Sequence, residues 1–79
     1  MRIDKFLKVS RLIKRRTVAN EACDSDRILL NGKTAKPGDR VKVGDIIELK
    51  FGDNTMKVQV ELLSEHVTKE GAADLYKVL

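Results

Sequence analysis

Apolar side chains recur at helical spacing near the start of the chain. Asp4 is suited to cap a helix over residues 4–13, because a carboxylate accepts hydrogen bonds from free backbone amides. A second helix is expected to begin with Thr17 as its cap and to run through Cys23. One side of the first helix, together with the residue before it, carries four apolar positions: Ile3, Phe6, Leu7 and Ile13.

Strand-like alternation follows from residue 28 onward. A first strand over 28–30 leads into Asn31-Gly32, a strong signal for a tight turn with positive φ. Val41 and Val43 also alternate and are expected to lie in a strand. Two longer runs should pair as a hairpin with these side chains facing one way: Ile47, Leu49 and Phe51, then Met56, Val58, Val60 and Leu62.

The C-terminal residues return to helical spacing. Thr68 is expected to cap a last helix, which would carry four apolar side chains on one face: Ala72, Leu75, Tyr76 and Leu79. The predicted fold class is therefore α+β, with an N-terminal helix pair packed on a small, mostly antiparallel sheet and a short C-terminal helix. We expect residues 1–79 to form a single domain.

Composition agrees with a small folded domain. A chain of 79 residues buries only about 60% of its unfolded surface, which fits a charged fraction of 35%. The longest apolar run, Ile28 to Leu30, is far too short for a membrane span or a signal peptide. Cys23 is the only cysteine, so an intramolecular disulfide and a cysteine zinc cluster are excluded. We expect a cytoplasmic protein without membrane contact.

Positive charge is concentrated at one end of the chain. The first 16 residues hold seven basic side chains and one acidic side chain, a net charge of +6, whereas the other 63 hold 9 basic and 11 acidic ones, a net charge of −2. A patch of this kind is typical of a polyanion binder. The candidate RNA-binding residues are Arg2, Lys5, Lys8, Arg11, Lys14, Arg15, Arg16 and Lys33.

Two features inside this basic region suggest how it would bind. Lys5, Lys8 and Arg11 are spaced by three and would form one stripe on the first helix. The cations at 14–16 precede the second helix, where positive charge is unfavourable unless an anion binds to the free backbone amides.

No group of residues suggests catalysis. His66 is the only histidine and is expected at the surface, Cys23 falls among apolar positions, and the carboxylates are scattered. The glycines match no phosphate-binding or dinucleotide fingerprint. We therefore expect a protein that is not an enzyme and needs neither a cofactor nor a metal.

The few aromatic side chains bear on the kind of RNA. Phe6, Phe51 and Tyr76 all lie on apolar faces and are expected in the core. Without exposed rings for stacking, binding should depend on the phosphate positions of a structured RNA rather than on unpaired bases.

Three motifs follow one another along the first half of the chain: Arg2-x-Asp4-Lys5-x-Leu7-x3-Arg11-Leu12, Arg15-Arg16-Thr17-x-Ala19 and Arg27-Ile28-x-Leu30-Asn31-Gly32-Lys33. With these motifs, residues 2–47 resemble the alpha-L RNA-binding domain of ribosomal protein S-four. Lys36-Pro37, Val41 and Gly44-Asp45-Ile46 fit the end of that domain. The resemblance implies a helix pair on a small sheet that binds rRNA or tRNA, with Arg2, Lys5, Arg15 and Arg16 in contact.

One position departs from the pattern of that family. The family commonly has glycine just before the position of Arg27, and this chain has Asp26. Aspartate tolerates a left-handed backbone better than most residues, so we expect the turn to persist at some energetic cost.

The length of the chain limits which proteins with an alpha-L domain it resembles. A free-standing alpha-L domain followed by a hairpin and a short helix, over residues 48–79, resembles the RqcP family, the short bacterial relatives of heat-shock protein fifteen. This resemblance implies a factor of ribosome quality control that supports C-terminal tailing of stalled chains. The implied partners are 23S rRNA of the obstructed large ribosomal subunit, peptidyl-tRNA and a quality-control elongation factor, with the protein itself a monomer.

Two other functions are compatible with a basic face. The first is a general RNA-binding protein that acts in ribosome assembly or as an RNA chaperone. The second is an adaptor whose basic patch docks on an acidic protein surface. RNase treatment distinguishes the adaptor from the RNA binders, because only RNA-dependent association would then disappear.

Overall fold

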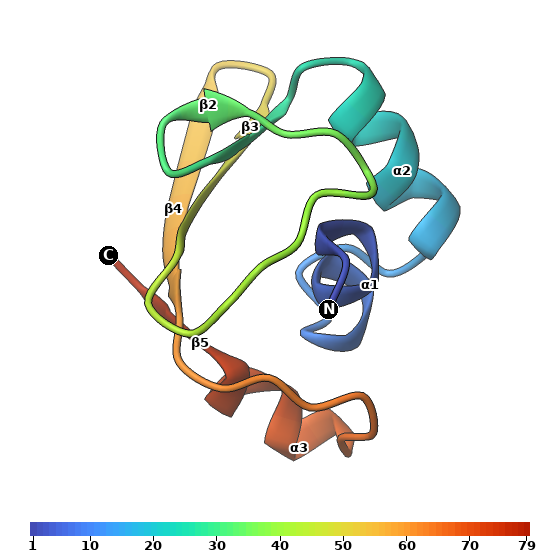
Figure 1. Cartoon of the computed structure of the whole chain (residues 1–79), viewed down its shortest axis with the longest axis vertical. Coiled ribbons are helices and arrows are strands. Elements are labelled where there is room, and N and C mark those ends of the chain that lie inside the picture. The colour runs from blue at the N-terminus through green and yellow to red at the C-terminus, as the bar shows by residue number, and fades with distance from the viewer.

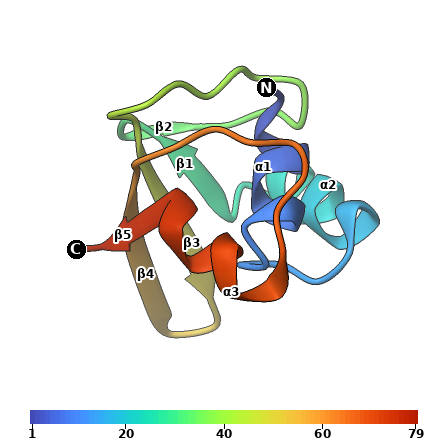
Figure 2. The same ribbon diagram turned by 90° about the horizontal axis from the view of Figure 1, so that it is seen from below.

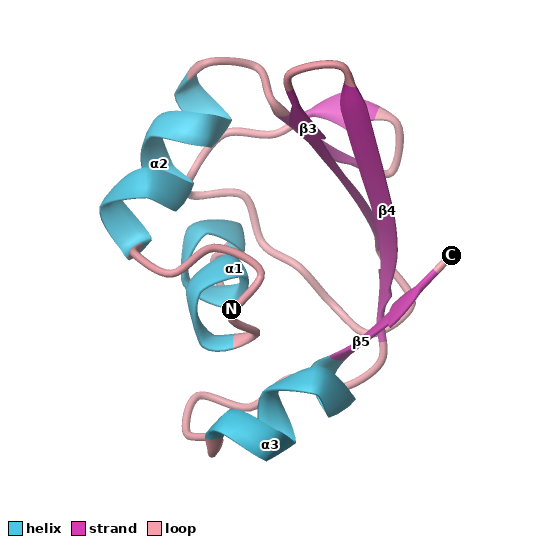
Figure 3. Cartoon of the chain, turned by 180° about the vertical axis from the view of Figure 1, so that it is seen from behind, coloured by secondary structure: helices cyan, strands magenta, loops and turns pink.

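The computed structural model describes residues 1–79 and confirms the predicted α+β class. A helix pair packs on one side of a five-stranded antiparallel sheet of order β2-β1-β3-β4-β5, and a third helix lies near the C-terminus (Figures 1 and 3). None of the helices has the length and apolar character needed to cross a membrane. The elements are α1 (Ile3–Val9), α2 (Arg16–Asp24), β1 (Ile28–Leu30), β2 (Lys33–Thr34), β3 (Ile46–Phe51), β4 (Asn54–Val60), α3 (Lys69–Ala72), the 3-10 turn η1 (Ala73–Leu75) and β5 (Tyr76–Val78).

Helix α1 is shorter than predicted and differs at both ends. Its cap residue is Arg2, and Asp4 lies buried inside the first turn, so the predicted cap at Asp4 was wrong. The helix ends at Val9 because Arg11 adopts a left-handed backbone with φ of 63°. The N–H of Ile13 then donates to the carbonyl oxygen of Leu7 at 3.0 Å, which keeps Ile13 in the core although it lies beyond the helix.

Helix α2 begins two residues earlier than expected. Arg15 is its cap residue and Thr17 lies within the first turn, so the prediction of Thr17 as the cap was wrong. After the helix, Asp26 takes a φ of 60°, and the N–H of Arg27 donates to the carbonyl oxygen of Ala22 at 3.0 Å. Asp26 thus adopts the left-handed conformation expected where the family commonly has glycine.

Both predicted hairpins are present in the sheet. Asn31 and Gly32 have φ of 52° and 84°, as a type I′ turn requires, and they join β1 to β2. The longer hairpin pairs β3 with β4, with Ile47 opposite Val58. The predicted strand over Val41 and Val43 was wrong, because the chain there pairs with Met1 and Arg2 only through an isolated bridge and one backbone hydrogen bond.

The C-terminal segment is part helix and part strand. The Thr68 hydroxyl accepts a hydrogen bond from the N–H of Gly71 at 3.1 Å, which confirms Thr68 as a cap. The helical region ends at Leu75, and Tyr76–Val78 become β5, so the predicted helix through Leu79 was wrong. The physical reason is that the edge of β4 offers unpaired backbone groups, which a strand satisfies and a helix does not.

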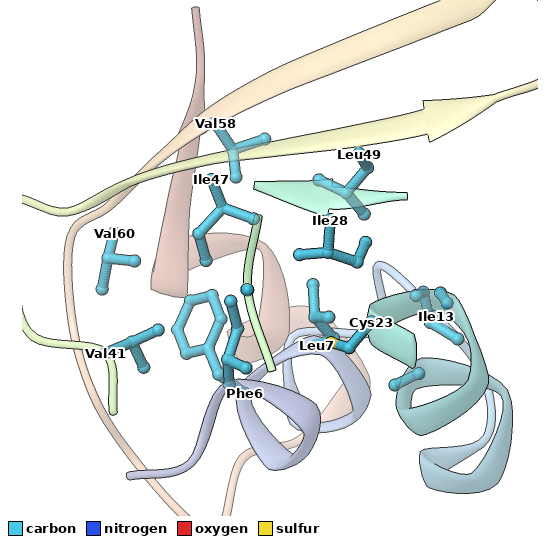
Figure 4. Packing of buried hydrophobic residues seen from close by; sticks show 14 of the residues in the cluster. Phe6, Leu7, Ile13, Cys23, Ile28, Val41, Ile47, Leu49, Val58 and Val60 are labelled. Atoms are coloured by element: carbon cyan, nitrogen blue, oxygen red, sulfur yellow. The ribbon is translucent and has the colours of Figure 1, made fainter. Parts of the chain in front are cut away.

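The core lies between the helix pair and the sheet. Phe6 and Leu7 point from α1 toward Ile28, Ile47 and Val60 (Figure 4). Two side chains predicted to face inward are instead exposed: Phe51 at 44% and Leu62 at 51%. Phe51 is the last residue of β3, and Leu62 lies beyond the end of β4.

We predict that Cys23 is chemically silent while the protein is folded. The side chain is 1% exposed, and burial, with the charges of Asp4, Asp24 and Asp39, raises the thiol pKa to about 11. Iodoacetamide at neutral pH should therefore modify Cys23 only after denaturant unfolds the chain. Cys23→Ala should retain RNA binding and lose only about 1 kcal/mol of stability. Rapid alkylation of the folded protein, measured by mass spectrometry, would contradict this.

Candidate nucleic-acid interface

A buried carboxylate holds the helix pair together. Asp4 on α1 has a side chain only 2% exposed, and it accepts hydrogen bonds from Arg2 Nη2 at 3.2 Å and Arg16 Nη2 at 3.4 Å. Asn20 Nδ2 lies at 3.5 Å, and the N–H of Lys5 at 2.8 Å. Since Arg16 and Asn20 belong to α2, this one side chain links both helices.

The protonation equilibrium of Asp4 reflects these contacts. Burial by itself would raise its pKa, but the hydrogen bond and charge of Arg16, the N–H of Lys5 and the charge of Arg2 outweigh burial and lower the pKa below 3.8. Asp4 is therefore ionised at neutral pH, and it offsets part of the positive charge where Arg2 and Arg16 meet.

A basic hollow forms where α1 faces the C-terminal segment, and we call it the α1–α3 hollow. Lys8 lines this hollow from α1. Arg11, in its left-handed turn, and Lys14 line it from the segment after the helix. Figure 2 shows the C-terminal segment running past α1 into α3. The lining residues are Lys8, Val9, Arg11, Lys14, Glu65, His66, Val67, Thr68 and Lys69.

The cations of this hollow lack acidic partners. Lys8, Arg11, Lys14 and Lys69 make no ion pair within 4.0 Å, and the only carboxylate in the lining, Glu65, is bonded to Lys5 Nζ at 2.9 Å. Neighbouring charges of one sign repel one another unless an anion is present. The hollow is thus suited to bind phosphates.

A second basic element surrounds the N-terminus of α2. Arg15 is the cap residue, but its side chain makes no capping hydrogen bond. The N–H groups of Arg16, Thr17 and Val18 donate to no acceptor in the protein. The N-terminus of α1 differs, because the N–H groups of its first residues donate to carbonyl oxygens of the loop at 37–39. Within the helix pair, the α2 terminus alone therefore offers free amides beside exposed cations.

The structure divides the predicted RNA-binding residues into three groups. Arg2, Lys5 and Arg16 have carboxylate partners, and the exposed cations at 8, 11, 14 and 15 have none. Lys5, Lys8 and Arg11 do not form one helical stripe, because Arg11 lies past the end of α1. Lys33 lies apart, on the β1–β2 hairpin, where it lines a separate shallow hollow with Asp39.

Sequence reasoning missed two residues of the α1–α3 hollow. Lys69 and His66 lie more than fifty positions after Arg11 in the sequence, and no local pattern connects them to it. The ion pair between Lys5 and Glu65 links the two segments at the surface. An acidic side chain in the C-terminal segment was the one available signal, because it could pair with the basic helix.

Comparison with known proteins places this geometry among RNA-binding domains. Residues 1–47 match the model of the S4 domain. The chain is 52% identical over 79 residues to the RQC P-site tRNA stabilizing factor of Listeria innocua, covering 100% of this chain and 86% of that protein. The factor of the same name from Bacillus subtilis is also 52% identical, with 100% and 92% covered.

The fold also matches a solved structure. Heat Shock Protein 15 of Vibrio cholerae, described as trimeric, superposes with a TM-score of 0.92 at 29% sequence identity. The match covers 100% of this chain and 81% of that one. It therefore extends beyond the region of the S4 domain model and includes the C-terminal segment that lines the α1–α3 hollow.

We predict that Asp4→Asn loosens the helix pair. The amide keeps one acceptor but directs an N–H toward cationic donors, so stability should fall by about 1–3 kcal/mol in urea denaturation. The pKa of Asp4 is lower in the folded state, so its contribution is complete above 3.8 and is lost as pH falls through the folded pKa. The difference in unfolding free energy between wild type and Asp4→Asn should therefore shrink as the pH falls.

A matched control is Asp74→Asn, which changes an exposed carboxylate without an ion pair. Equal effects of the two substitutions would show that Asp4 has no special role in joining the helices.

Proposed function

Because the chain belongs to the S4 domain family and to the RQC P-site tRNA stabilizing factors within it, we propose that it binds RNA in bacterial ribosome-associated quality control. Its task would be to hold the P-site tRNA on the large ribosomal subunit while a stalled chain receives its C-terminal tail. The protein would act in the cytoplasm by binding alone, without catalysing a reaction.

The observation that carries the proposal is the set of unpaired cations on the helix pair. Lys8, Arg11, Lys14 and Arg15 project from a rigid unit and lack protein partners, in a chain whose remaining 63 residues are net acidic. Phosphates of a folded RNA have fixed separations, and cations on a fixed scaffold can match them without ordering either partner. This arrangement supports recognition of RNA shape.

The two basic elements support simultaneous contact with two RNAs. The α1–α3 hollow and the N-terminus of α2 share Lys14 but otherwise consist of different residues. A protein that contacts 23S rRNA with one element and peptidyl-tRNA with the other would make the second binding event intramolecular, which raises its effective affinity. Such bridging would slow loss of the tRNA from the P site, and it needs only one copy of the protein.

Arg2 and Arg16 would have two tasks. Each side chain is about half exposed, at 45% and 46%, and each guanidinium also contacts buried Asp4. Both could contact phosphate with their free N–H groups while Asp4 holds them in position. Substituting either one would therefore disturb stability as well as binding, and the unpaired cations are cleaner probes of the interface.

We predict that Lys8→Ala and Lys14→Ala weaken tRNA binding without unfolding the protein. Each removes an exposed charge, so stability should change by no more than about 0.5 kcal/mol. Each lost phosphate contact should make the slope of log affinity against log salt shallower by roughly 0.7–0.9. Titrations at several salt concentrations measure both effects.

Lys77→Ala provides the matched control for these titrations. Lys77 is an exposed lysine paired with Gln59 in the sheet, and it lines neither basic element. Its loss should change neither affinity nor salt slope. If it behaves like Lys14→Ala, binding reflects net charge and not a defined interface.

We further predict the place of the protein in the cell. On sucrose gradients it should migrate with large ribosomal subunits that retain tRNA, and the double substitution Lys14→Ala, Arg15→Ala should release it to the top. Cells without the protein should accumulate stalled chains that lack C-terminal tails. Migration with small subunits alone would favour a role in ribosome assembly. Association that survives RNase would favour the adaptor hypothesis.

A further inference from the structure

An exposed aromatic ring lies beside the basic face. Phe51 is the last residue of β3, immediately before the β3–β4 turn, and its side chain is 44% exposed. Next to it, the N–H of Lys50 donates to the carbonyl oxygen of Arg27, in the segment between α2 and β1, at 2.8 Å. Phe51 lines a hollow of about 610 Å³ between the hairpin, the 12–15 turn and α2.

The lining of this hollow combines apolar and cationic side chains. Leu12, Ile13, Val18, Ala22 and Phe51 supply the apolar surface. The charged lining residues are three cations and one acidic side chain: Lys14, Arg15, Arg27 and Glu21. None of the three cations forms an ion pair within the protein.

We propose that this hollow binds an unpaired nucleobase, which stacks on Phe51 while Arg15 and Arg27 hold the flanking phosphates. The inference rests on the proposed RNA-binding function and adds a contact that function does not require. It replaces the expectation from sequence that no ring is available for stacking, since Phe51 is not in the core.

The chemistry of the hollow favours an unpaired base over other occupants. A base has an apolar, aromatic face and anionic phosphates on either side, which matches a hollow lined by one aromatic ring and three cations. A continuous RNA helix keeps its base faces stacked internally and could engage only the cations. The hollow is also contiguous with the proposed phosphate-binding elements, because Lys14 and Arg15 belong to both.

The test compares two hairpin RNAs that differ only in a single bulged nucleotide. With wild type, the bulged RNA should bind more tightly than the fully paired one. Phe51→Ala should weaken binding of the bulged RNA by roughly 5- to 150-fold, the range for loss of one stacked base, and leave the paired RNA almost unchanged. A fluorescent adenine analogue at the bulge should change its emission with wild type and not with the variant.

Two further variants separate stacking from simple apolar contact. Phe51→Tyr keeps the ring and should retain binding of the bulged RNA, whereas Phe51→Leu keeps apolar area without a ring and should behave like Phe51→Ala. Thermal unfolding of all three variants establishes that they remain folded, as expected for a residue at the exposed end of a strand.

The outcomes distinguish this inference from the proposed function. If wild type binds neither tRNA nor either hairpin, the RNA-binding function itself fails. If wild type binds RNA but Phe51→Ala weakens both hairpins equally, or neither of them, only the base-binding assignment fails. Loss of ribosome association by Phe51→Ala without any change in RNA affinity would also overturn it, and would identify a protein as the occupant.

Discussion

The arrangement of the basic face depends on the contacts of one buried carboxylate. Asp4 is almost inaccessible to solvent, and burying a carboxylate is unfavourable unless donors surround it. Donors from Arg2, Lys5, Arg16 and Asn20 meet this requirement, and they come from both helices. The angle between α1 and α2 is therefore restricted by electrostatics as well as by apolar packing. That angle determines how far apart the unpaired cations lie.

The cations of this protein have separate tasks. Arg2 and Arg16 contact buried Asp4, and Lys5 forms an exposed ion pair with Glu65 of the C-terminal segment. Those at 8, 11, 14 and 15 keep their charge unsatisfied. Arg11 also has a left-handed backbone, which costs a residue other than glycine about 1–2 kcal/mol. The turn at Arg11 ends α1 and lets the following residues line the α1–α3 hollow.

The C-terminal segment contributes both to the core and to the basic surface. Leu75 is fully buried, and β5 completes the sheet along β4, so the segment shares the core of the S4 domain. Packing it there places Lys69 and His66 beside Lys8 and adds a second wall to the basic surface. An S4 domain without this segment would present a flatter face to RNA.

The sequence by itself determined the fold class, both hairpins and the basic character of the N-terminal helix pair. These features depend on local spacing and turn chemistry, which Asn31-Gly32 and the alternation around Ile47 and Val58 display directly. The cap at Thr68 could also be predicted from the sequence, because threonine is favoured immediately before the first residue of a helix.

Only the tertiary structure decided the roles of Asp4, Phe51 and Tyr76. A carboxylate at the start of a helix suits a cap or a buried anchor equally well until Arg16 approaches from the second helix. An apolar residue that continues a strand pattern is expected inside, yet Phe51 is exposed and lines a hollow with residues of α2. Tyr76 has helical spacing but lies beside the open edge of β4, whose backbone groups require partners. In each case the surroundings come from residues distant in the sequence, which local patterns do not reveal.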